Sequence, residues 1–231
     1  MALSTDAMMV LFYDFDGDTA DHDDWHSTQH FLERLLVPGF MRATRWVATT
    51  GTPRYLVTYE VGDTDVGTSA PYLARLNDPT PWTIEMMPRF RGMIRGFCKI
   101  VASYGLGLGA TALTLRFTPP TDHLVAKLAE SVLAEIAALP GVVSVLMLRP
   151  VAPPPMTREQ SLRGADTPMP WLVLVTAHGP APLEAVEIRY FDKARLRDLG
   201  ASDDLVLSRY AMAHTAVAAD AKRAQAHMSG L

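Results

Sequence analysis

Three histidines recur at steps of four residues near the start of the chain, at His22, His26 and His30. On one continuous helix this spacing places them in a single ridge. Neutral imidazole can accept a proton near physiological pH and return it, so such a ridge could support general acid–base chemistry. Two histidines four residues apart can also bind zinc, but a structural zinc site needs four ligands and a catalytic site usually three. The sequence contains no compact Cys, His or Glu cluster that would complete such a set.

The helix that carries this ridge also has an apolar side, formed by Trp25, Leu32 and Leu36. At about 100° per residue, the two leucines lie within about 20° of Trp25, whereas His26 and His30 lie about 100° and 140° away from it. The pattern therefore predicts that the ridge faces away from the centre of the buried side. Three interpretations stay open: solvated or loosely hydrogen-bonded histidines, a site at a cleft or subunit contact, and a metal site.

Two β-rich runs supply further candidates. Arg42 and Trp46 share one face of the first run by the period of two, and Tyr55 and Tyr59 share one face of the second. If the runs pair through the turn between them, they form an aromatic wall with a cationic arm, which suits an aromatic acid. Ordinary barrel packing with Arg42 at the rim is the alternative. Trp82, in a proline-rich segment, either closes one mouth of a pocket or anchors that segment on the core.

Composition limits the classes of function. The 231 residues are 48% apolar and 20% charged, which is typical of a globular protein of one large or two small domains. A net charge of -4 provides no broad basic field, so we expect no nucleic-acid partner. The one cysteine, Cys98, lies in an apolar run and is predicted to be a buried thiol. No disulfide can form within the chain, and no signal peptide or membrane span is recognised, so we expect a cytoplasmic protein.

Two stretches of the chain show the same order of elements. Strand patterns over 7–15, 40–49, 55–61 and 93–103, with helical patterns ending at Pro38-Gly39 and over 69–76, give the order βαββαβ. After the glycine-rich linker 105–109, predicted to be a flexible joint, the order repeats with strands over 110–117, 142–151, 171–177 and 204–217 and helices over 122–139 and 183–199. We predict halves at 1–104 and 110–218 and a helical tail at 219–231.

The strands themselves indicate how the halves combine. Residues 112–115 and 172–175 are apolar at nearly every position, so both faces of each sheet must be covered. Two helices per half cover only one face. The predicted fold is therefore α+β, with two tandem ferredoxin-like βαββαβ halves whose antiparallel sheets face each other as a dimeric α/β barrel. The rival arrangement pairs each sheet with a second chain, in a homodimer. The long proline-rich segment 152–169 is predicted to be a lid or a disordered insert.

Several local motifs resemble a known family. They are Trp25-His-Ser-Thr-Gln-His30, Glu33-Arg-Leu-Leu-Val-Pro-Gly-Phe40, Tyr59-Glu60 and Asn77-Asp-Pro-Thr-Pro-Trp82. Their order and spacing over roughly residues 7–103 resemble the EthD-like members of the dimeric α+β barrel superfamily. The sequence departs from that pattern at Gln29, where an acidic residue is usual, and at His26, where an aromatic residue is frequent. The resemblance implies a small apolar or aromatic ligand, held inside the barrel or between sheet and helices.

The leading functional prediction is a cofactor-independent enzyme that moves a proton on a small aromatic or apolar carbonyl compound, in the lyase, isomerase or cyclase range. One alternative is a non-catalytic binding or accessory protein, and another is a haem- or metal-dependent enzyme that uses the histidine ridge. No P-loop, GxSxG or CxxC motif is present, and residues 105–109 make a poor dinucleotide fingerprint. We expect no cofactor and no metal. The predicted catalytic residues are His30, His26 and Tyr59, and the predicted substrate-binding residues are Arg42, Trp46, Tyr55 and Trp82.

Overall fold

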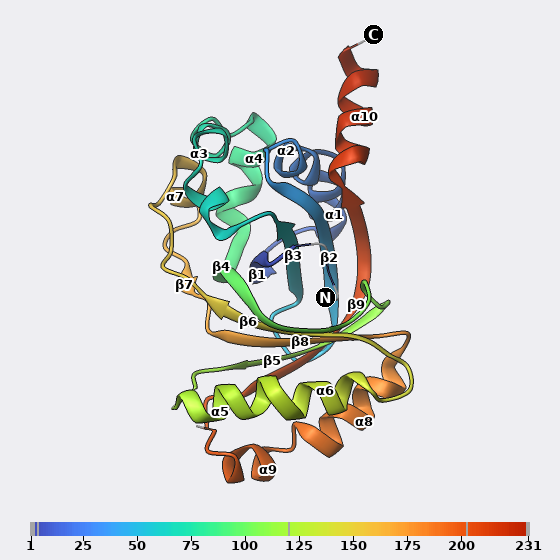
Figure 1. Ribbon diagram of the computed structural model, residues 1–231. Coiled ribbons are helices and arrows are strands. Elements are labelled where there is room, and N and C mark those ends of the chain that lie inside the picture. The colour runs from blue at the N-terminus through green and yellow to red at the C-terminus, as the bar shows by residue number, and fades with distance from the viewer. Residues whose placement is uncertain (1–2, 4, 120, 202, 230–231) are drawn as a thin grey trace.

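Runs of aliphatic, aromatic and β-branched residues form a closed barrel in the computed structural model, which describes residues 3, 5–119, 121–201 and 203–229. Within these residues, eight antiparallel strands follow one another around the barrel in the order β1-β3-β2-β9-β5-β8-β6-β4, and β4 returns to β1 (Figure 1). A short strand, β7, runs parallel to β4. The strands are β1 Ala7–Phe15, β2 Phe40–Thr50, β3 Tyr55–Val61, β4 Phe90–Gly105, β5 Thr111–Phe117, β6 Val142–Pro150, β7 Thr167–Pro168, β8 Trp171–Ala177 and β9 Val206–Val217.

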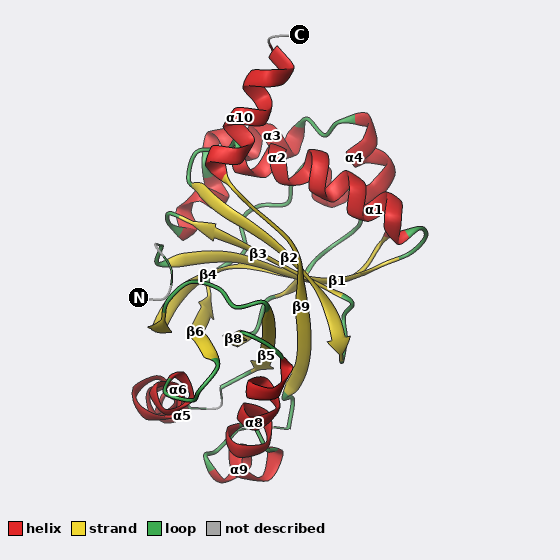
Figure 2. Cartoon of the chain, turned by 90° about the vertical axis from the view of Figure 1, so that its right-hand side faces the viewer, coloured by secondary structure: helices red, strands yellow, loops and turns green. Residues whose placement is uncertain are grey.

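We call β4-β1-β3-β2 the first sheet and β9-β5-β8-β6 the second sheet. Helices cover the outer face of each one, so that the barrel lies between two helical layers (Figures 1 and 2). Over the first sheet lie α1 Thr19–Trp25, the π turn η1 His26–His30, α2 Phe31–Leu35, η2 Thr64–Thr68, α3 Ala70–Asn77, α4 Pro81–Met86 and η3 Met87–Arg89. Over the second lie α5 Asp122–Lys127, the π turn η4 Leu128–Val132, α6 Leu133–Ala137, α8 Pro180–Tyr190 and α9 Lys193–Asp198.

Side chains fill the barrel. Met8, Phe12, Trp46 and Leu174 belong to a buried cluster contributed by both sheets, while separate clusters lie between each sheet and its helices. Both faces of every sheet are thus sheltered, as the apolar strands predicted, and this burial is the main force that closes the fold. One chain completes the barrel, so the rival pairing of each sheet with a second chain is not needed.

Cys98 lies inside the barrel and is buried, as predicted. Burial raises the pKa of its thiol to about 12. The thiolate, which is the reactive form of cysteine, is therefore scarce at neutral pH. Cys98 is a packing residue of the barrel interior.

Two short segments show order that the sequence patterns did not predict. The proline-rich segment around Trp82 contains α4, because the Thr80 hydroxyl accepts from the backbone N–H of Thr83 and Pro81 takes the first turn, where its missing N–H costs nothing. In the linker 105–109, predicted to be a flexible joint, Leu106 is 82% exposed but the last residue is packed. Gly109 is buried, and a Cβ atom there would lie 2.3 Å from the carbonyl oxygen of Ala177. Glycine is needed at this position for a close approach of two backbones.

The long segment after β6 is ordered, with α7 Arg158–Ser161 and β7 along its course. It passes beside the helices of the first sheet, where α7 lies close to α3 (Figure 1). After β9 the chain ends in α10 Ala218–Ser229, which projects away from the barrel (Figures 1 and 2). Among the described residues, no helix has the length and apolar character needed to cross a membrane.

Candidate functional site

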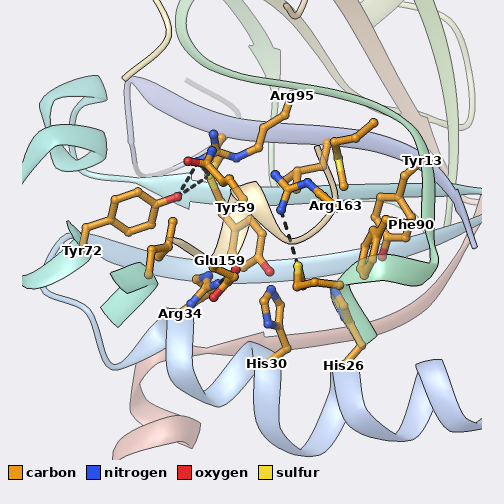
Figure 3. Close-up of a pocket in the computed structure, with 16 residues that line it drawn as sticks. Tyr13, His26, His30, Arg34, Tyr59, Tyr72, Phe90, Arg95, Glu159 and Arg163 are labelled. Carbon is orange, nitrogen blue, oxygen red and sulfur yellow. Dashed lines mark hydrogen bonds and ion pairs between the residues drawn. The ribbon is translucent and has the colours of Figure 1, made fainter. Parts of the chain in front are cut away.

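A small cavity of about 30 Å³ lies between the outer face of the first sheet and the helices above it. Strands β1 and β3 contribute Tyr13 and Tyr59 to its walls, and the helical layer contributes His26 and His30 (Figure 3). Glu159 of α7 closes the cavity from another side. The three predicted catalytic residues, His30, His26 and Tyr59, are therefore brought together in one place.

The histidine ridge faces the sheet. The exposed fractions are 0% for His22, 2% for His26 and 7% for His30, and the last two point into the cavity (Figure 3). The prediction that the ridge faces away from the buried side was wrong. Its assumption of about 100° per residue fails at the π turn His26–His30, whose hydrogen bonds span five residues and widen the helix. The wider turn lets Trp25 and the histidines share the buried side, and the Trp25 and His30 rings lie 4.5 Å apart.

Both cavity histidines have an unsatisfied nitrogen. Within the described residues, Nδ1 of His26 and Nδ1 of His30 are buried and have no hydrogen-bond partner. Burial lowers the pKa of both imidazoles well below the usual 6.5, and for His30 the charges of Arg34 and Arg163 act in the same direction. Both rings are therefore neutral at pH 7. Each is available to a ligand as a proton acceptor or hydrogen-bonding group.

The corresponding turn over the second sheet contains none of these polar groups. A π turn, Leu128–Val132, occupies the same place relative to the Pro140-Gly141 corner as His26–His30 does relative to Pro38-Gly39. Counted from those corners, Leu128, Val132 and Ile136 correspond to His26, His30 and Arg34. These three apolar residues are packed into the core beneath the second sheet. The fold thus builds this turn without histidine, so packing alone does not account for the imidazoles.

Three guanidinium groups line the cavity. Arg34 forms a buried ion pair with Glu159, which ties α2 to α7. Arg95 lies 2.5 Å from the Tyr72 hydroxyl and 3.7 Å from the carboxylate of Asp166. Arg163 donates two hydrogen bonds to Asp166, of 3.0 and 2.9 Å. With the histidines neutral, three positive charges face two carboxylates, so the surroundings of the cavity favour an anion.

Tyr59 and Tyr72 add hydroxyl groups to this site, and Tyr13 also lines it. Burial raises the pKa of Tyr59 above its usual 10, so its phenol stays protonated at neutral pH. The Tyr72 hydroxyl also contacts the sulfur of Met9, at 3.4 Å. Neutral phenols can donate a hydrogen bond to a developing negative charge.

Sequence reasoning missed the contribution of the segment after β6. Glu159, Gln160 and Arg163 all line the cavity. Their side chains reach it because α7 is held in place, and its start is fixed by a capping box in which Gln160 accepts from the backbone N–H of Thr157 at 2.8 Å. The pattern Thr157-x-x-Gln160 was the available signal for this helix. Nothing in the sequence alone indicated that it lies on the first sheet's helical layer.

A second hollow, of about 260 Å³, adjoins the cavity, and Arg95 and Gln160 line both. Pro153 and Met156 border it on the outer side, where the Met156 side chain is exposed. A cavity of about 30 Å³ holds only a few waters, whereas a site for a single aromatic ring needs about 150 Å³. An aromatic ligand would therefore require the side chains between the two spaces to move.

The other predicted binding residues lie elsewhere. Arg42 forms an ion pair with Glu60, with Nε and Oε1 3.0 Å apart, and Trp46 donates to Thr58 inside the barrel. Tyr55 is on the opposite, helix-facing side of the first sheet. The expected aromatic wall is not formed, because Arg42 pairs in register with Glu60 and not with Tyr59.

Tyr55 and Trp82 do not line the cavity. Tyr55 packs against His22, with ring centroids 4.4 Å apart. Trp82, on α4, is partly buried against the first sheet's outer core, as an anchor would be. As for a metal, no group of three or more His, Cys, Asp or Glu side chains among the described residues is arranged to hold one.

No protein-family model matches the chain, and no curated protein matches its sequence. Several solved structures do match the chain in structure. A protein described as anthrone oxidase-like has a TM-score of 0.66 and 13% identity, with 94% of this chain and 96% of that one covered. A putative monooxygenase from Fusobacterium nucleatum has a TM-score of 0.57 and 7% identity, covering 93% and 96%. A mutant chlorite dismutase from Candidatus Nitrospira defluvii has a TM-score of 0.51 and 9% identity, covering 92% and 93%.

The likeness is one of fold. It agrees with the α+β barrel fold expected from the sequence, and it extends over more than nine-tenths of this chain. At such low identity it does not carry over a reaction, because one fold hosts many unrelated chemistries.

Proposed function

We propose that this protein is a cofactor-independent enzyme that binds a small aromatic carbonyl compound and removes a proton from its activated carbon. The ligand occupies the cavity under α2 and α7 together with the adjoining hollow, after the side chains between the two spaces move. His30 is the proton acceptor, and His26 and Tyr59 hold the oxygen on which negative charge develops. Arg34 and Arg163 stabilise the resulting enolate or phenolate by their charge. Arg42, Trp46 and Trp82 take no part in this site.

The single observation that carries the proposal is the pair of buried, neutral imidazoles with unpartnered nitrogens where the second sheet's helix has leucine and valine. A buried polar group without a partner costs about 1–3 kcal/mol. The equivalent turn of the second sheet forms with Leu128 and Val132, which have no polar group to satisfy. Histidine at positions 26 and 30 therefore adds nothing to stability. A ligand that hydrogen-bonds to both rings removes the cost.

In the chemical step, the C–H bond of the ligand breaks, its proton passes to a nitrogen of His30, and the electron pair is delocalised onto the carbonyl oxygen. Return of the proton to a different atom gives an isomer, and loss of a leaving group from the neighbouring carbon gives a lyase product. Attack of the enolate carbon on a second carbonyl of the same molecule, whose oxygen then takes up the proton, gives a cyclase product. The names of the structural neighbours suggest dioxygen as another reactant for such an anion. Uptake of dioxygen would extend the proposal to an oxygenase.

We also infer that the chain is a tandem pair of ferredoxin-like halves, 1–104 and 110–218, with the tail 219–231, and that the first half is EthD-like. The supporting observations are the βαββαβ order of each half, the strand orders β4-β1-β3-β2 and β9-β5-β8-β6, and the π turn at equivalent places. We infer that the first half carries the proposed base and most of the site. A single buried thiol fits the cytoplasm as its compartment.

The test is deuterium incorporation from D₂O into 2-tetralone and anthrone, two ketones whose activated C–H adjoins an aromatic ring. We expect exchange faster than in buffer, and we expect His30→Ala to remove it. The variant Arg42→Ala is a matched control because Arg42 lies on the barrel side of β2. Tight binding of these ketones without any exchange would favour the alternative of a non-catalytic binding protein. Exchange that survives His30→Ala would remove His30 from the mechanism.

A further inference from the structure

A second set of polar groups leads from the cavity toward the surface. Tyr13 lines the cavity, and its hydroxyl oxygen lies 3.1 Å from Nε2 of His22. On the other side of the ring, Nδ1 of His22 lies 2.8 Å from a carboxylate oxygen of Asp23. Tyr13 and His22 are buried, whereas the Asp23 side chain is 37% exposed. The three groups make a continuous hydrogen-bonded chain between the cavity and solvent.

We propose that Tyr13, His22 and Asp23 form a proton relay between the cavity and the surface. The proposal rests on the proposed function, because a buried base that takes a proton from a ligand needs a route to exchange it with water. Tyr13 lies at the end of the cavity where His26 lies (Figure 3). The relay therefore starts beside the groups that would handle the ligand.

The neighbours of His22 set the direction of its hydrogen bonds. The ionised Asp23 carboxylate can only accept, so the Nδ1–H of neutral His22 donates to it and Nε2 accepts from the Tyr13 hydroxyl. Burial opposes ionisation of Asp23, but the hydrogen bond from His22 and the charge of Arg45 outweigh it and lower the pKa of that carboxyl. Arg45 also donates to the backbone carbonyl of Asp23 at 3.1 Å, which fixes the relay's outer end.

Proton flow through this chain is balanced at each group. The Tyr13 oxygen takes a proton from the cavity while its own proton passes to Nε2 of His22. His22 then releases the proton on Nδ1 to Asp23, and Asp23 gives it to water. One proton leaves the cavity, and the reverse sequence brings one back and restores all three groups.

Aromatic side chains restrict other routes for water to reach His22. The rings of Phe15, Tyr55 and Phe90 have centroids 4.6, 4.4 and 6.0 Å from that of the imidazole. His26 stacks on it at 5.4 Å. The charged groups that act on His22 are Asp23, Arg45 and Arg54. Exchange with solvent is thus directed through Asp23.

The second sheet again provides a comparison. Counted from the Pro-Gly corners, Leu124 and Val125 correspond to His22 and Asp23. Leu124 is buried in the second sheet's outer core. The hydrogen-bonded chain is therefore not a requirement of the fold.

Exchange of tyrosine hydroxyl protons tests the relay without any ligand. In protein labelled at tyrosine ¹³Cζ and dissolved in equal parts of H₂O and D₂O, a slowly exchanging hydroxyl gives two ¹³Cζ resonances and a rapidly exchanging one gives a single averaged resonance. We expect one resonance for Tyr13 in spite of its burial. Tyr72 is the internal control, since it is equally buried and its hydroxyl contacts Arg95 and Met9 instead of an imidazole. Two resonances are expected for Tyr72.

The variant His22→Phe keeps a ring in place but removes both nitrogens. We expect exchange at Tyr13 to slow by about 100-fold, the lower end of what a positioned proton acceptor contributes. Asp23→Asn, at the more exposed end, is the milder variant and is expected to slow exchange as well.

Exchange at Tyr13 as slow as at Tyr72 in the unmodified protein would overturn the relay, and so would an unchanged rate in a folded His22→Phe. Rapid exchange at Tyr13 in a protein that fails to deuterate either ketone would refute the proposed function and leave the relay standing.

Discussion

Arg34 of α2 and Glu159 of α7 form a buried ion pair across 125 positions of sequence. Their exposed fractions are 2% and 3%. Arg34 is one helical turn after His30, and Glu159 belongs to the segment that closes the cavity. The pair therefore fastens this segment to the helix that carries the proposed base, and it places a positive charge beside that base.

Glu159→Gln is predicted to destabilise the protein strongly. The substitution keeps the shape of the side chain but leaves the Arg34 charge buried without a counter-ion, which typically costs about 3–5 kcal/mol. Urea unfolding followed by circular dichroism measures the change. Glu184→Gln is the control, because its ion pair with Arg209 is at the surface and should change stability by less than about 1 kcal/mol. Equal effects of the two variants would mean that the buried pair does not hold α7 in place.

The double variant His26→Leu with His30→Val introduces the residue types found at the equivalent π turn of the second sheet, Leu128 and Val132. We predict stability equal to or up to about 2 kcal/mol above that of the unmodified protein, because two unsatisfied imidazoles are removed from the interior. Ketone deuteration should fall by at least about 100-fold with the loss of the general base. Denaturant midpoints and deuterium incorporation check the two parts. A large loss of stability with exchange retained would show that the histidines serve packing.

Much of the barrel could be predicted from the sequence, because apolar residues on both faces of a strand have few alternatives to complete burial. The bounds of β1, β3 and β8 follow directly from such runs. The direction of the histidine ridge could not be predicted, since the π turn that reorients it forms in the folded context and has no sequence signal of its own.

The part of the cavity wall formed by Glu159 and Arg163 could not be predicted either, for a different reason. Glu159 and Arg163 meet the cavity only through long-range packing of α7 on the first sheet's helices. Local patterns predict turns and caps, but they carry no information on which distant surface a long connection will cover. The aromatic wall failed because of strand register: Arg42 opposes Glu60 on the barrel side, one position away from Tyr59 on the helix side.

Stability is predicted to fall as the pH drops from about 6.5 to 5. The pKa values of His26 and His30 are well below 6.5 in the folded state, so the unfolded chain binds more protons in this window and stability is lost on acidification. Each histidine contributes at most about 1.4 kcal/mol per pH unit. The double variant His26→Leu with His30→Val, compared with the unmodified protein by urea unfolding at several pH values, should show a shallower loss. The pKa values of Glu33 and Glu60 are raised in the folded state, so these two groups increase stability on acidification. Both residues are present in both proteins, so their effect cancels in the comparison. Parallel curves for the two proteins would show that these histidines protonate as easily in the folded state as in the unfolded one.

Arg163→Met and Arg42→Met are predicted to differ in their effect on an anionic ligand. Arg163 lines the cavity with only 5% of its side chain exposed, whereas Arg42 is 41% exposed and is paired with Glu60 on the barrel side. A hydrogen bond to a charged group is worth about 1.5–3 kcal/mol, so the loss of Arg163 should weaken binding of 2-naphtholate, a stable mimic of the tetralone enolate, by about 10- to 150-fold. Arg42→Met should leave binding within about twofold, because it removes no group that reaches the ligand. Titration calorimetry at a pH where the naphthol is ionised gives both constants. Weakening by Arg42→Met alone would move the anion site to the barrel side of β2 and remove the cavity under α7 from the mechanism, since the two arginines lie on opposite faces of the first sheet.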